Sequence, residues 1–314
     1  MKRFIVLSLL SAFMLLGVGF LAAPTHAQNP PTDLKPTFIS PTPGLYVNGW
    51  PAFTVSYPKE WVEEPNPAPG PVFSAGGIRP DLPPGWHRPF IGIDVFPSSL
   101  SLEEWAKVYM PGFLQAFTDI KILSDKPSQL KDGTAAREVE YEFVHKAGGH
   151  KVNDFILMTK KELAWVAIHL MNDQGRIGDD LKRIAYSLTF QPDREKPVQV
   201  PPDVRAFLDM CCVDMMGHDV KAIMEHYSDR FLSSGTSKPI QEHWFRNDPD
   251  SPISKDIISL EAVVTVFELR GDKAYIDGFF LSKVKGDANA LKSPMRVYQI
   301  INEHGEWKWF GNQK

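Results

Sequence analysis

The sequence predicts an α+β fold of two domains, each built around an antiparallel sheet. Two observations predict this class. The N-terminal half has strand-like runs at both ends with a helix between them, and the C-terminal half has helices first and long strands afterwards. A third observation separates the halves, because residues 191–202 (QPDREKPVQVPP) are polar, charged and rich in proline, as interdomain linkers are. We therefore expect one domain over residues 45–190 and a second over residues 203–314.

Residues 1–27 have the pattern of a cleavable export signal. Lys2 and Arg3 precede an apolar run, and Thr25-His26-Ala27 offers small residues to a signal peptidase. The alternative is a retained anchor, since the run is just long enough to span a bilayer. We expect a periplasmic or secreted protein with no stable membrane insertion after cleavage. Residues 28–44 are rich in proline and predict a disordered lead-in.

Composition excludes several classes of function. The chain has 34 basic and 38 acidic residues, and no basic cluster suited to the phosphates of a nucleic acid. It has 2 cysteines, which are adjacent, so core burial and not distant disulfides must stabilise the fold. Motifs of the common hydrolase and phosphate-binding sites are absent from the sequence.

The first domain is predicted from strand patterns and one capped helix. A strand at Phe53–Tyr57 stops at Pro58, which cannot donate to a sheet ladder. Ser101 and Glu104 form a capping box that begins a helix. The other expected elements are strands at Phe90–Phe96, Ala135–Val144, Asn153–Lys160 and Ala164–Leu170, and a helix at Asp179–Leu188. Between them, Glu64–Pro89 is a long insertion rich in proline and glycine.

This order of elements, with the run FTVSYPKEW, resembles the PsbP-like family. Tyr57, Pro58 and Trp61 carry the most specific part, and the resemblance extends from about Tyr46 to Phe190. It implies an α/β/α sandwich with an antiparallel sheet. It also implies a non-enzymatic accessory or binding protein of an exported compartment, and it supplies no catalytic residue.

The second domain is predicted to begin with three helices. Pro201-Pro202-Asp203 starts the first, and Gly217 ends it. Asp219 caps the second helix, which buries residues up to Tyr227 and leaves His226 at the surface. A third, short helix starts at Ser237. Strands are expected at Ile257–Leu269, Lys273–Val284, Met295–Ile301 and Glu306–Gly311.

The stretch DMCCVDMMGHD in the first of these helices contains both cysteines. The pairs Cys211/Met215 and Cys212/Met216 are four residues apart, the spacing at which a helix could aim two soft ligands at Cu(I). The other soft side chains spread around the helix, however, and free cysteine and methionine are ordinary core residues. We interpret the stretch as a packed helix face. Copper binding and a strained disulfide between the adjacent cysteines are the alternatives.

The segments GHDVKAIMEHYSDRF and WKWFGNQ resemble the nuclear transport factor 2-like superfamily, also called SnoaL-like or ketosteroid-isomerase-like. The resemblance covers about Val204 to Gln313. It implies a cone-shaped α+β domain whose curved antiparallel sheet folds against helices around an apolar cavity. Members include isomerases and dehydratases, and many others only bind a ligand or a partner. The expected ligand-binding residues are Phe207, Cys211, Met215, Tyr275 and Phe279.

One acidic residue is a candidate for catalysis in that cavity. Strand alternation puts Asp277 between Tyr275 and Phe279 on one face of the sheet. If that face is concave, Asp277 is the best candidate base and Tyr227 could be its hydrogen-bond partner. If the face is convex, Asp277 is an ordinary outward carboxylate.

The sequence favours an exported, non-enzymatic binding or accessory protein that needs no cofactor and no metal. Its expected partner is a small apolar molecule in the C-terminal cavity or another exported protein, with a homodimer also possible. The alternatives are an isomerase or dehydratase that uses Asp277 and Tyr227, and a copper-handling protein that uses Cys212 and Met216. His145, His150 and Asp154 surround the Gly148-Gly149 hairpin and could together hold a metal ion, but a solvated turn is favoured.

Overall fold

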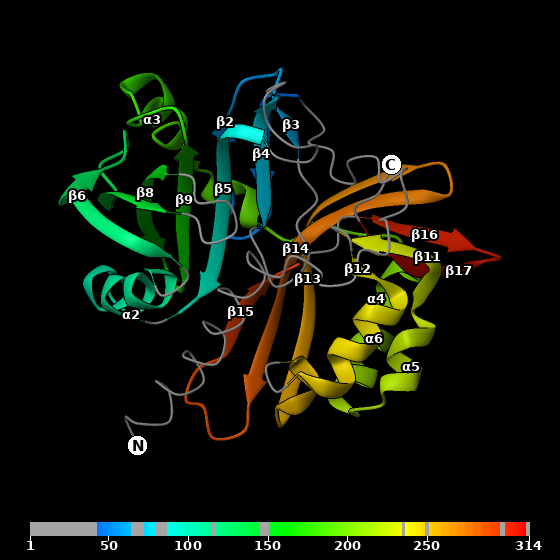
Figure 1. The fold of residues 1–314 in the computed structure, drawn as a ribbon. Helices are drawn as coiled ribbons and strands as arrows, with labels where there is room; N and C mark the ends of the chain where they lie inside the picture. The colour runs from blue at the N-terminus through cyan, green and yellow to red at the C-terminus, as the bar shows by residue number, and fades with distance from the viewer. Residues whose placement is uncertain are drawn as a thin grey trace. The chain divides into compact units, whose positions relative to one another are not determined.

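The computed structural model describes residues 43–63, 72–78, 87–98, 100–114, 117–144, 151–233, 236–248, 251–295 and 299–311. The expected signal segment, most of the proline-rich lead-in and part of the 64–89 insertion lie outside these residues. The chain forms two compact units, which we describe one at a time (Figure 1). The N-terminal unit contains Thr54–Thr189, and the C-terminal unit contains Phe190–Lys314. Few helices and mostly antiparallel strands confirm the predicted α+β class.

The N-terminal unit is built on a seven-stranded sheet with the order β3-β4-β5-β9-β8-β7-β6. Its neighbouring strands are all antiparallel. The strands are β3 (Val62–Glu63), β4 (Phe73–Ile78), β5 (His87–Pro97), β6 (Thr118–Gln129), β7 (Ala135–Val144), β8 (Lys151–Lys161) and β9 (Ala164–Asn172). A three-stranded sheet is formed by β1 (Leu45–Asn48), β2 (Phe53–Ser56) and β10 (Thr189–Phe190).

A helix packs on each face of the seven-stranded sheet, because the central strands are apolar on both faces. Helix α2 (Leu102–Leu114) places Trp105 against Trp165 of β9, with their rings stacked at 5.0 Å. Helix α3 (Asp179–Ala185) lies on the other face, where the Lys182 ammonium is 5.2 Å from the Phe155 ring. This two-sided packing matches the expected α/β/α sandwich.

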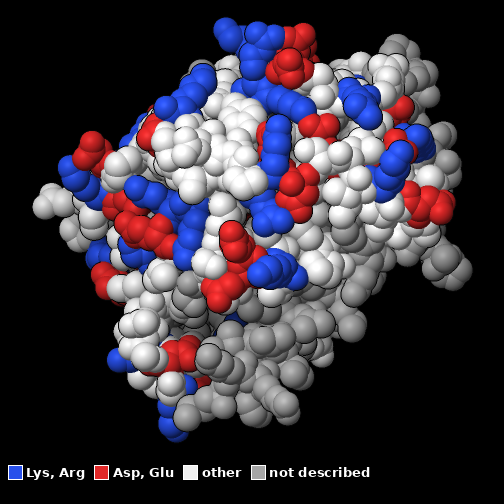
Figure 2. Space-filling view, turned by 90° about the vertical axis from the view of Figure 1, so that its left-hand side faces the viewer, with Lys and Arg blue, Asp and Glu red and all other residues white. Residues whose placement is uncertain are grey.

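Charged side chains of both signs lie side by side on the molecular face drawn in Figure 2. Within the N-terminal unit, alternate glutamates of β7 each pair with a lysine from a different element. Glu138 pairs with Lys126 of β6 at 2.6 Å and Glu142 with Lys151 of β8 at 2.7 Å, while Glu140 pairs with Lys182. These pairs tie β6, β8 and α3 to β7.

The C-terminal unit packs three helices on one face of a curved sheet with the order β12-β11-β17-β16-β14-β13, with β15 beside β14. The helices are α4 (Pro202–Met216), α5 (Val220–Glu225) and α6 (Lys238–Asn247), with short 3-10 turns η1 (Pro192–Glu195) and η2 (Pro252–Ser254). The strands are β11 (Tyr227–Ser233), β12 (Thr236–Ser237), β13 (Ile257–Arg270), β14 (Lys273–Val284), β15 (Leu291–Pro294), β16 (Gln299–Glu303) and β17 (Glu306–Gly311).

Three expectations for secondary structure are corrected. The second helix was predicted to reach Tyr227, but α5 ends at Glu225, and Tyr227 begins β11, which runs parallel to β17. The sheet of this unit is therefore not wholly antiparallel. The strand predicted at Met295–Ile301 is present from Gln299 as β16, whereas Met295 lies outside β15 and β16, which pair with different parts of β14.

Two of the longer strands of the N-terminal unit, β4 and β6, were not predicted from the sequence. The 64–89 insertion contains β4, so part of it is sheet. β6 was missed because its sequence, TDIKILSDKPSQ, is charged and contains a proline. Such residues are typical of an edge strand, where they discourage pairing with other chains.

A segment from the N-terminal half belongs to the C-terminal unit. Residues Val47–Phe53, which we name the strap, group with Phe190–Lys314 and not with the domain predicted over residues 45–190. The strap lies against β13 and β14, on the sheet face opposite the helices. Trp50 of the strap is 5.9 Å from the Phe279 ring, and the Thr265 hydroxyl donates to the Gly49 carbonyl at 3.4 Å. The strap therefore covers the outer face of this sheet.

Gly278 should be indispensable to the C-terminal unit. Its φ is +156°, and a Cβ atom there would lie 2.0 Å from the backbone oxygen of Val263. Gly278→Ala must displace strand β13, and we expect it to lower the free energy of unfolding by about 3 kcal/mol or more. Chemical denaturation followed by circular dichroism measures this loss.

Gly271→Ala is the matched control. Its φ is also positive, at +65°, but no atom lies within 4 Å of the added Cβ. We expect only the cost of the backbone conformation, about 1 kcal/mol. Equal losses for the two variants would contradict the close approach of β13 and β14.

Candidate functional site

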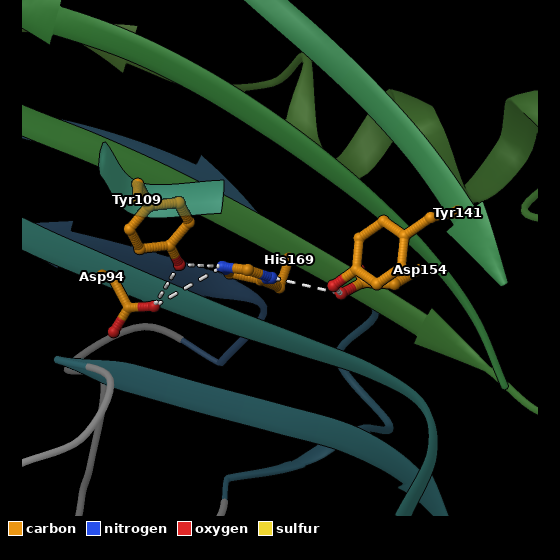
Figure 3. A network of polar contacts seen from close by, with 5 residues as sticks. All are labelled: Asp94, Tyr109, Tyr141, Asp154 and His169. Atoms are coloured by element: carbon orange, nitrogen blue, oxygen red, sulfur yellow. Dashed lines mark hydrogen bonds and ion pairs between the residues drawn. The ribbon is translucent and has the colours of Figure 1, made fainter. Parts of the chain in front are cut away.

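Five polar side chains from five different elements meet inside the N-terminal unit (Figure 3). They are Asp94 of β5, Tyr109 of α2, Tyr141 of β7, Asp154 of β8 and His169 of β9. All five are classed as buried, and His169 is 3% exposed. We name this cluster the His169 network.

Strand register places the two carboxylates on opposite sides of the imidazole. On β9, His169 lies opposite Gly92 of β5 and Ile156 of β8. Asp94 and Asp154 are each two residues away from those partners, so both point to the same face of the sheet as His169. Each carboxylate is therefore a diagonal neighbour of the imidazole, one on each adjoining strand.

Hydrogen bonds join the five groups into a chain. His169 Nδ1 is 3.2 Å from Asp154 Oδ2, which also accepts from the Tyr141 hydroxyl at 2.5 Å. On the other side of the ring, His169 Nε2 is 2.6 Å from the Tyr109 hydroxyl, which is 3.5 Å from Asp94 Oδ2. His169 Nε2 and Asp94 Oδ2 are also close, at 3.6 Å.

The network favours a protonated imidazole. Burial acts to lower the pKa of His169, but the attraction and hydrogen bond of Asp154 and the charge of Asp94 raise this pKa above its ordinary value of 6.5. The imidazolium can then donate from Nδ1 to Asp154 and from Nε2 to Tyr109, while Tyr109 donates to Asp94. Every hydrogen bond in the chain has a donor and an acceptor in this state.

The two tyrosines act as donors. Burial, together with the nearby carboxylates, holds the pKa values of Tyr109 and Tyr141 well above 10. Asp154 Oδ1 is the one atom of the network that is buried without a hydrogen-bond partner. Its second oxygen, Oδ2, accepts from both Tyr141 and His169.

Helix α2 is attached to the sheet through this network and through aromatic packing. Tyr109 reaches His169 with its hydroxyl, and its ring stacks on Trp105 at 4.3 Å. Trp105 in turn stacks on Trp165. The polar contacts fix the rotation of the helix, which apolar packing alone specifies less sharply.

The chemistry open to the His169 network is limited by its own hydrogen bonds. A general base needs a ring nitrogen within reach of a substrate atom, but both nitrogens of His169 are bonded to protein groups. Asp94 and Asp154 lie on opposite sides of the ring, and no group of three potential ligands within the described residues is arranged to hold a metal ion. The geometry is that of a closed, hydrogen-bonded cluster inside a core.

The structure separates the predicted catalytic pair. Tyr227 lies in the helix-covered core of the C-terminal unit, together with Ala274 and Ile276 of β14. Asp277 faces the opposite side of the sheet, where it contacts Gly49 of the strap. A joint role for Asp277 and Tyr227 in one cavity is therefore corrected, because strand alternation sends their side chains to different faces.

Asp277 is covered by the strap and not by a substrate cavity. It is 3% exposed, and its Oδ1 accepts from the Gly278 amide at 2.7 Å. Burial raises the pKa of Asp277 to about 7, although hydrogen bonds from the backbone of Gly278 and Gly49 act in the opposite direction. Inside the fold, this carboxyl is costly to ionise.

The predicted ligand-binding residues are divided in the same way. Phe207 and Cys211 are buried in the helix-covered core, and Met215 packs against it. Phe279 is on the strap side, and Tyr275 shares that face by alternation. The five residues therefore do not line one cavity.

The cysteines lie in a packed helix, as interpreted from the sequence. Both are free and buried. Burial raises the pKa of the Cys212 thiol to about 11 and shifts the pKa of the Cys211 thiol upward as well. Metals bind the thiolate, so these environments disfavour a Cu(I) site.

Sequence reasoning missed four members of the His169 network and placed the fifth, Asp154, beside a hairpin. The available signal was a polar residue inside an otherwise apolar strand, as in AWVAIHLMN for His169. Buried polar side chains need partners. His226 was also misplaced, since it is partly buried and its Nε2 is 2.7 Å from Asp214 Oδ2.

Comparison with known proteins gives similarity in structure only. No family model and no curated protein matches the chain. A cyanobacterial PsbP (CyanoP) from Synechocystis is similar at a TM-score of 0.37 and 11% identity, over 48% of this chain and 94% of that one. LpqN, involved in cell envelope biogenesis of Mycobacterium tuberculosis, is similar at a TM-score of 0.30 and 13% identity, over 45% and 83%.

A Bacteroides thetaiotaomicron protein is similar over more of the chain, with a TM-score of 0.35, 11% identity and coverage of 85% and 89%. A PsbP is thus among the structures similar to this chain, whereas the nuclear transport factor 2-like identity of residues 203–314 stays a prediction. No helix of the described residues is long and apolar enough to cross a membrane. Because these comparisons show similarity in structure alone, the function must be argued from the sites themselves.

The protonation of His169 can be tested by NMR of the labelled imidazole. We expect the pKa of His169 to lie above 6.5, to fall most in Asp154→Asn and to fall less in Asp94→Asn, because Asp154 is the closer partner, at 3.2 Å against 3.6 Å. Because its pKa is raised in the folded state, protonated His169 stabilises the fold fully below pH 6.5. This stabilisation is lost as the pH rises through the folded-state pKa of His169. A neutral His169 at pH 6 would contradict the network.

Proposed function

We propose that this chain is an exported accessory protein that binds another exported protein and catalyses no reaction of its own. The observation that carries the proposal is the closure of the His169 network. Its imidazole and carboxylates resemble catalytic groups, but both ring nitrogens are bonded within the fold. A buried cluster of this kind stabilises and specifies a scaffold. Export is supported by the leader pattern of residues 1–27.

A protein partner is favoured over a small apolar molecule. Phe207 and Cys211, which were expected to contact such a molecule, fill the core of the C-terminal unit. In contrast, Met210 and Val213 are 59% and 60% exposed on the outer side of α4. They are three residues apart and therefore adjacent on the helix surface. Exposed apolar neighbours of this kind are typical of interaction surfaces more than of solvated ones.

The two alternative functions, an isomerase or dehydratase and a copper-handling protein, depend on residues that do not lie together or are buried. An isomerase or dehydratase reaction needs an acid and a base at one substrate, whereas Asp277 and Tyr227 face different sides of the sheet. Copper handling needs accessible thiolates, whereas both thiols are buried and their pKa values are raised. We therefore retain the binding role alone.

Site-specific photo-crosslinking in the native host tests this proposal. Benzoylphenylalanine at Val213 should yield a discrete crosslinked protein band from the exported fraction. Lys221 is the matched control position, because it is exposed on the neighbouring helix α5 and is charged. A band at Val213 that is absent at Lys221 is the expected result.

Two outcomes would count against the proposed function. Recovery of the protein in the cytoplasmic fraction would contradict the proposal that the chain is exported. Equal labelling at Val213 and Lys221, or none at either, would remove α4 as the binding surface. Native mass spectrometry of residues 28–314 purified from the host then shows whether a retained small molecule is bound instead.

A further inference from the structure

The strap contacts the C-terminal sheet at Asp277 through Gly49. The Gly49 amide donates to the Asp277 carboxyl, and the Gly49 carbonyl accepts from the Thr265 hydroxyl at 3.4 Å. Both polar groups of the Gly49 backbone are therefore satisfied by side chains of β14 and β13. The strap side chain that follows, Trp50, is 1% exposed and packs near Phe279.

The contact between Gly49 and Asp277 is close enough to require glycine. A Cβ atom at position 49 would lie 2.3 Å from Asp277 Cγ and 2.5 Å from each carboxyl oxygen. No side chain fits between the strap and this carboxyl. Water is also kept from Asp277, since the residue is 3% exposed. The strap is thus the cover that buries the carboxyl.

The far end of the strap is held by contacts that do not involve Asp277. The Ala52 amide donates to Glu195 Oε1 at 2.9 Å, and the Ala52 carbonyl accepts from the Gln191 amide at 2.8 Å. The Phe53 and Phe190 rings are 6.2 Å apart in an edge-on arrangement. Local opening at Gly49 and Trp50 can therefore occur while residues 52 and 53 stay attached.

Charged groups around this contact are few. Lys292 of β15 lies 4.8 Å from the Phe279 ring and 6.0 Å from the Trp50 ring, and Glu195 of η1 is bonded to Ala52. On β13, the uncharged Thr265 hydroxyl donates to the Gly49 carbonyl. On β14, the next residue on the same face is Tyr275. The groups bonded to Asp277 itself are backbone amides.

The direction of the pH effect follows from linkage. Asp277 has its pKa raised to about 7 when covered, against 3.8 for an ordinary aspartate. A group with a raised pKa in the closed state stabilises that state fully below the ordinary value. This stabilisation is lost as the pH rises through the closed-state value. The free energy of strap closure should therefore become less favourable between about pH 4 and pH 7 and should stay constant above pH 7.

We propose that Asp277 makes the strap a pH-operated latch: Gly49 and Trp50 stay closed over the neutral carboxyl, and loss of the proton loosens them because a charge is then buried beneath the strap. Opening exposes the outer face of β13 and β14 at Thr265, Asp277 and Phe279. The inference is independent of the proposed binding role, because it concerns the opposite face of the sheet from α4.

Hydrogen exchange of the strap amides, followed by mass spectrometry and corrected for the intrinsic pH dependence, tests the latch. We expect protection of the Gly49 and Trp50 amides to fall by up to about a thousandfold between pH 4 and pH 7, since each pH unit between the two pKa values changes the equilibrium tenfold. Peptides from β8 in the N-terminal unit provide the reference with which the protection of the strap is compared at each pH. In Asp277→Asn this pH dependence should disappear.

Thr265→Val is the matched control variant. It removes a hydrogen bond to Gly49 without removing an ionisable group. Protection of the strap should fall at every pH, while its slope against pH stays that of the unmodified protein. This outcome separates titration of Asp277 from simple weakening of the strap.

Two results would overturn the latch. One is protection of the strap that does not change between pH 4 and pH 7, and the other is an unchanged slope in Asp277→Asn. If that variant does not fold, the unmodified protein decides the question through the ¹³Cγ resonance of Asp277. Titration of this resonance near 3.8 contradicts the proposal, and titration near 7 together with the fall in protection supports it.

Discussion

A single imidazolium between two carboxylates is the interaction on which the arrangement of the N-terminal unit depends. An ionised group is stable inside a core only if charge and hydrogen bonds compensate for its lost hydration. Asp94 and Asp154 supply the charge, and Tyr109 completes the hydrogen bonds from α2. Since these groups come from separate elements, the contact requires the register of β5, β8 and β9 and the placement of α2 to agree.

Local patterns predicted most of the elements, because they depend on residues close in sequence. The strand at Ala135–Val144 and the helix after Ser101 follow from alternation and from a capping box, and both are present. The sites were not predictable in this way. Asp94 and His169 are 75 residues apart in number, and only the sheet register makes them neighbours. Likewise, nothing local to Gly49 indicates that it lies on Asp277.

The structure also shows why a correct choice of residue can lead to a wrong role. Asp277 was selected because it stands between aromatic residues, and it is indeed a buried carboxyl, whose pKa burial raises to about 7. Perturbed carboxyls occur at catalytic sites and in structural clusters alike. Here the neighbour that lies on it is Gly49 of the strap, and this contact is the basis of the conformational role that we propose for its ionisation.

The most direct measurement is a neutron diffraction structure of the deuterium-exchanged protein at pH 6. The account predicts deuterium on both ring nitrogens of His169 and on the carboxyl of Asp277, with the Tyr109 hydroxyl directed toward Asp94. Deuterium on only one nitrogen of His169 would contradict the imidazolium, because a neutral ring would instead accept from the Tyr109 hydroxyl at its second nitrogen. An unprotonated Asp277 would remove the physical basis of the latch.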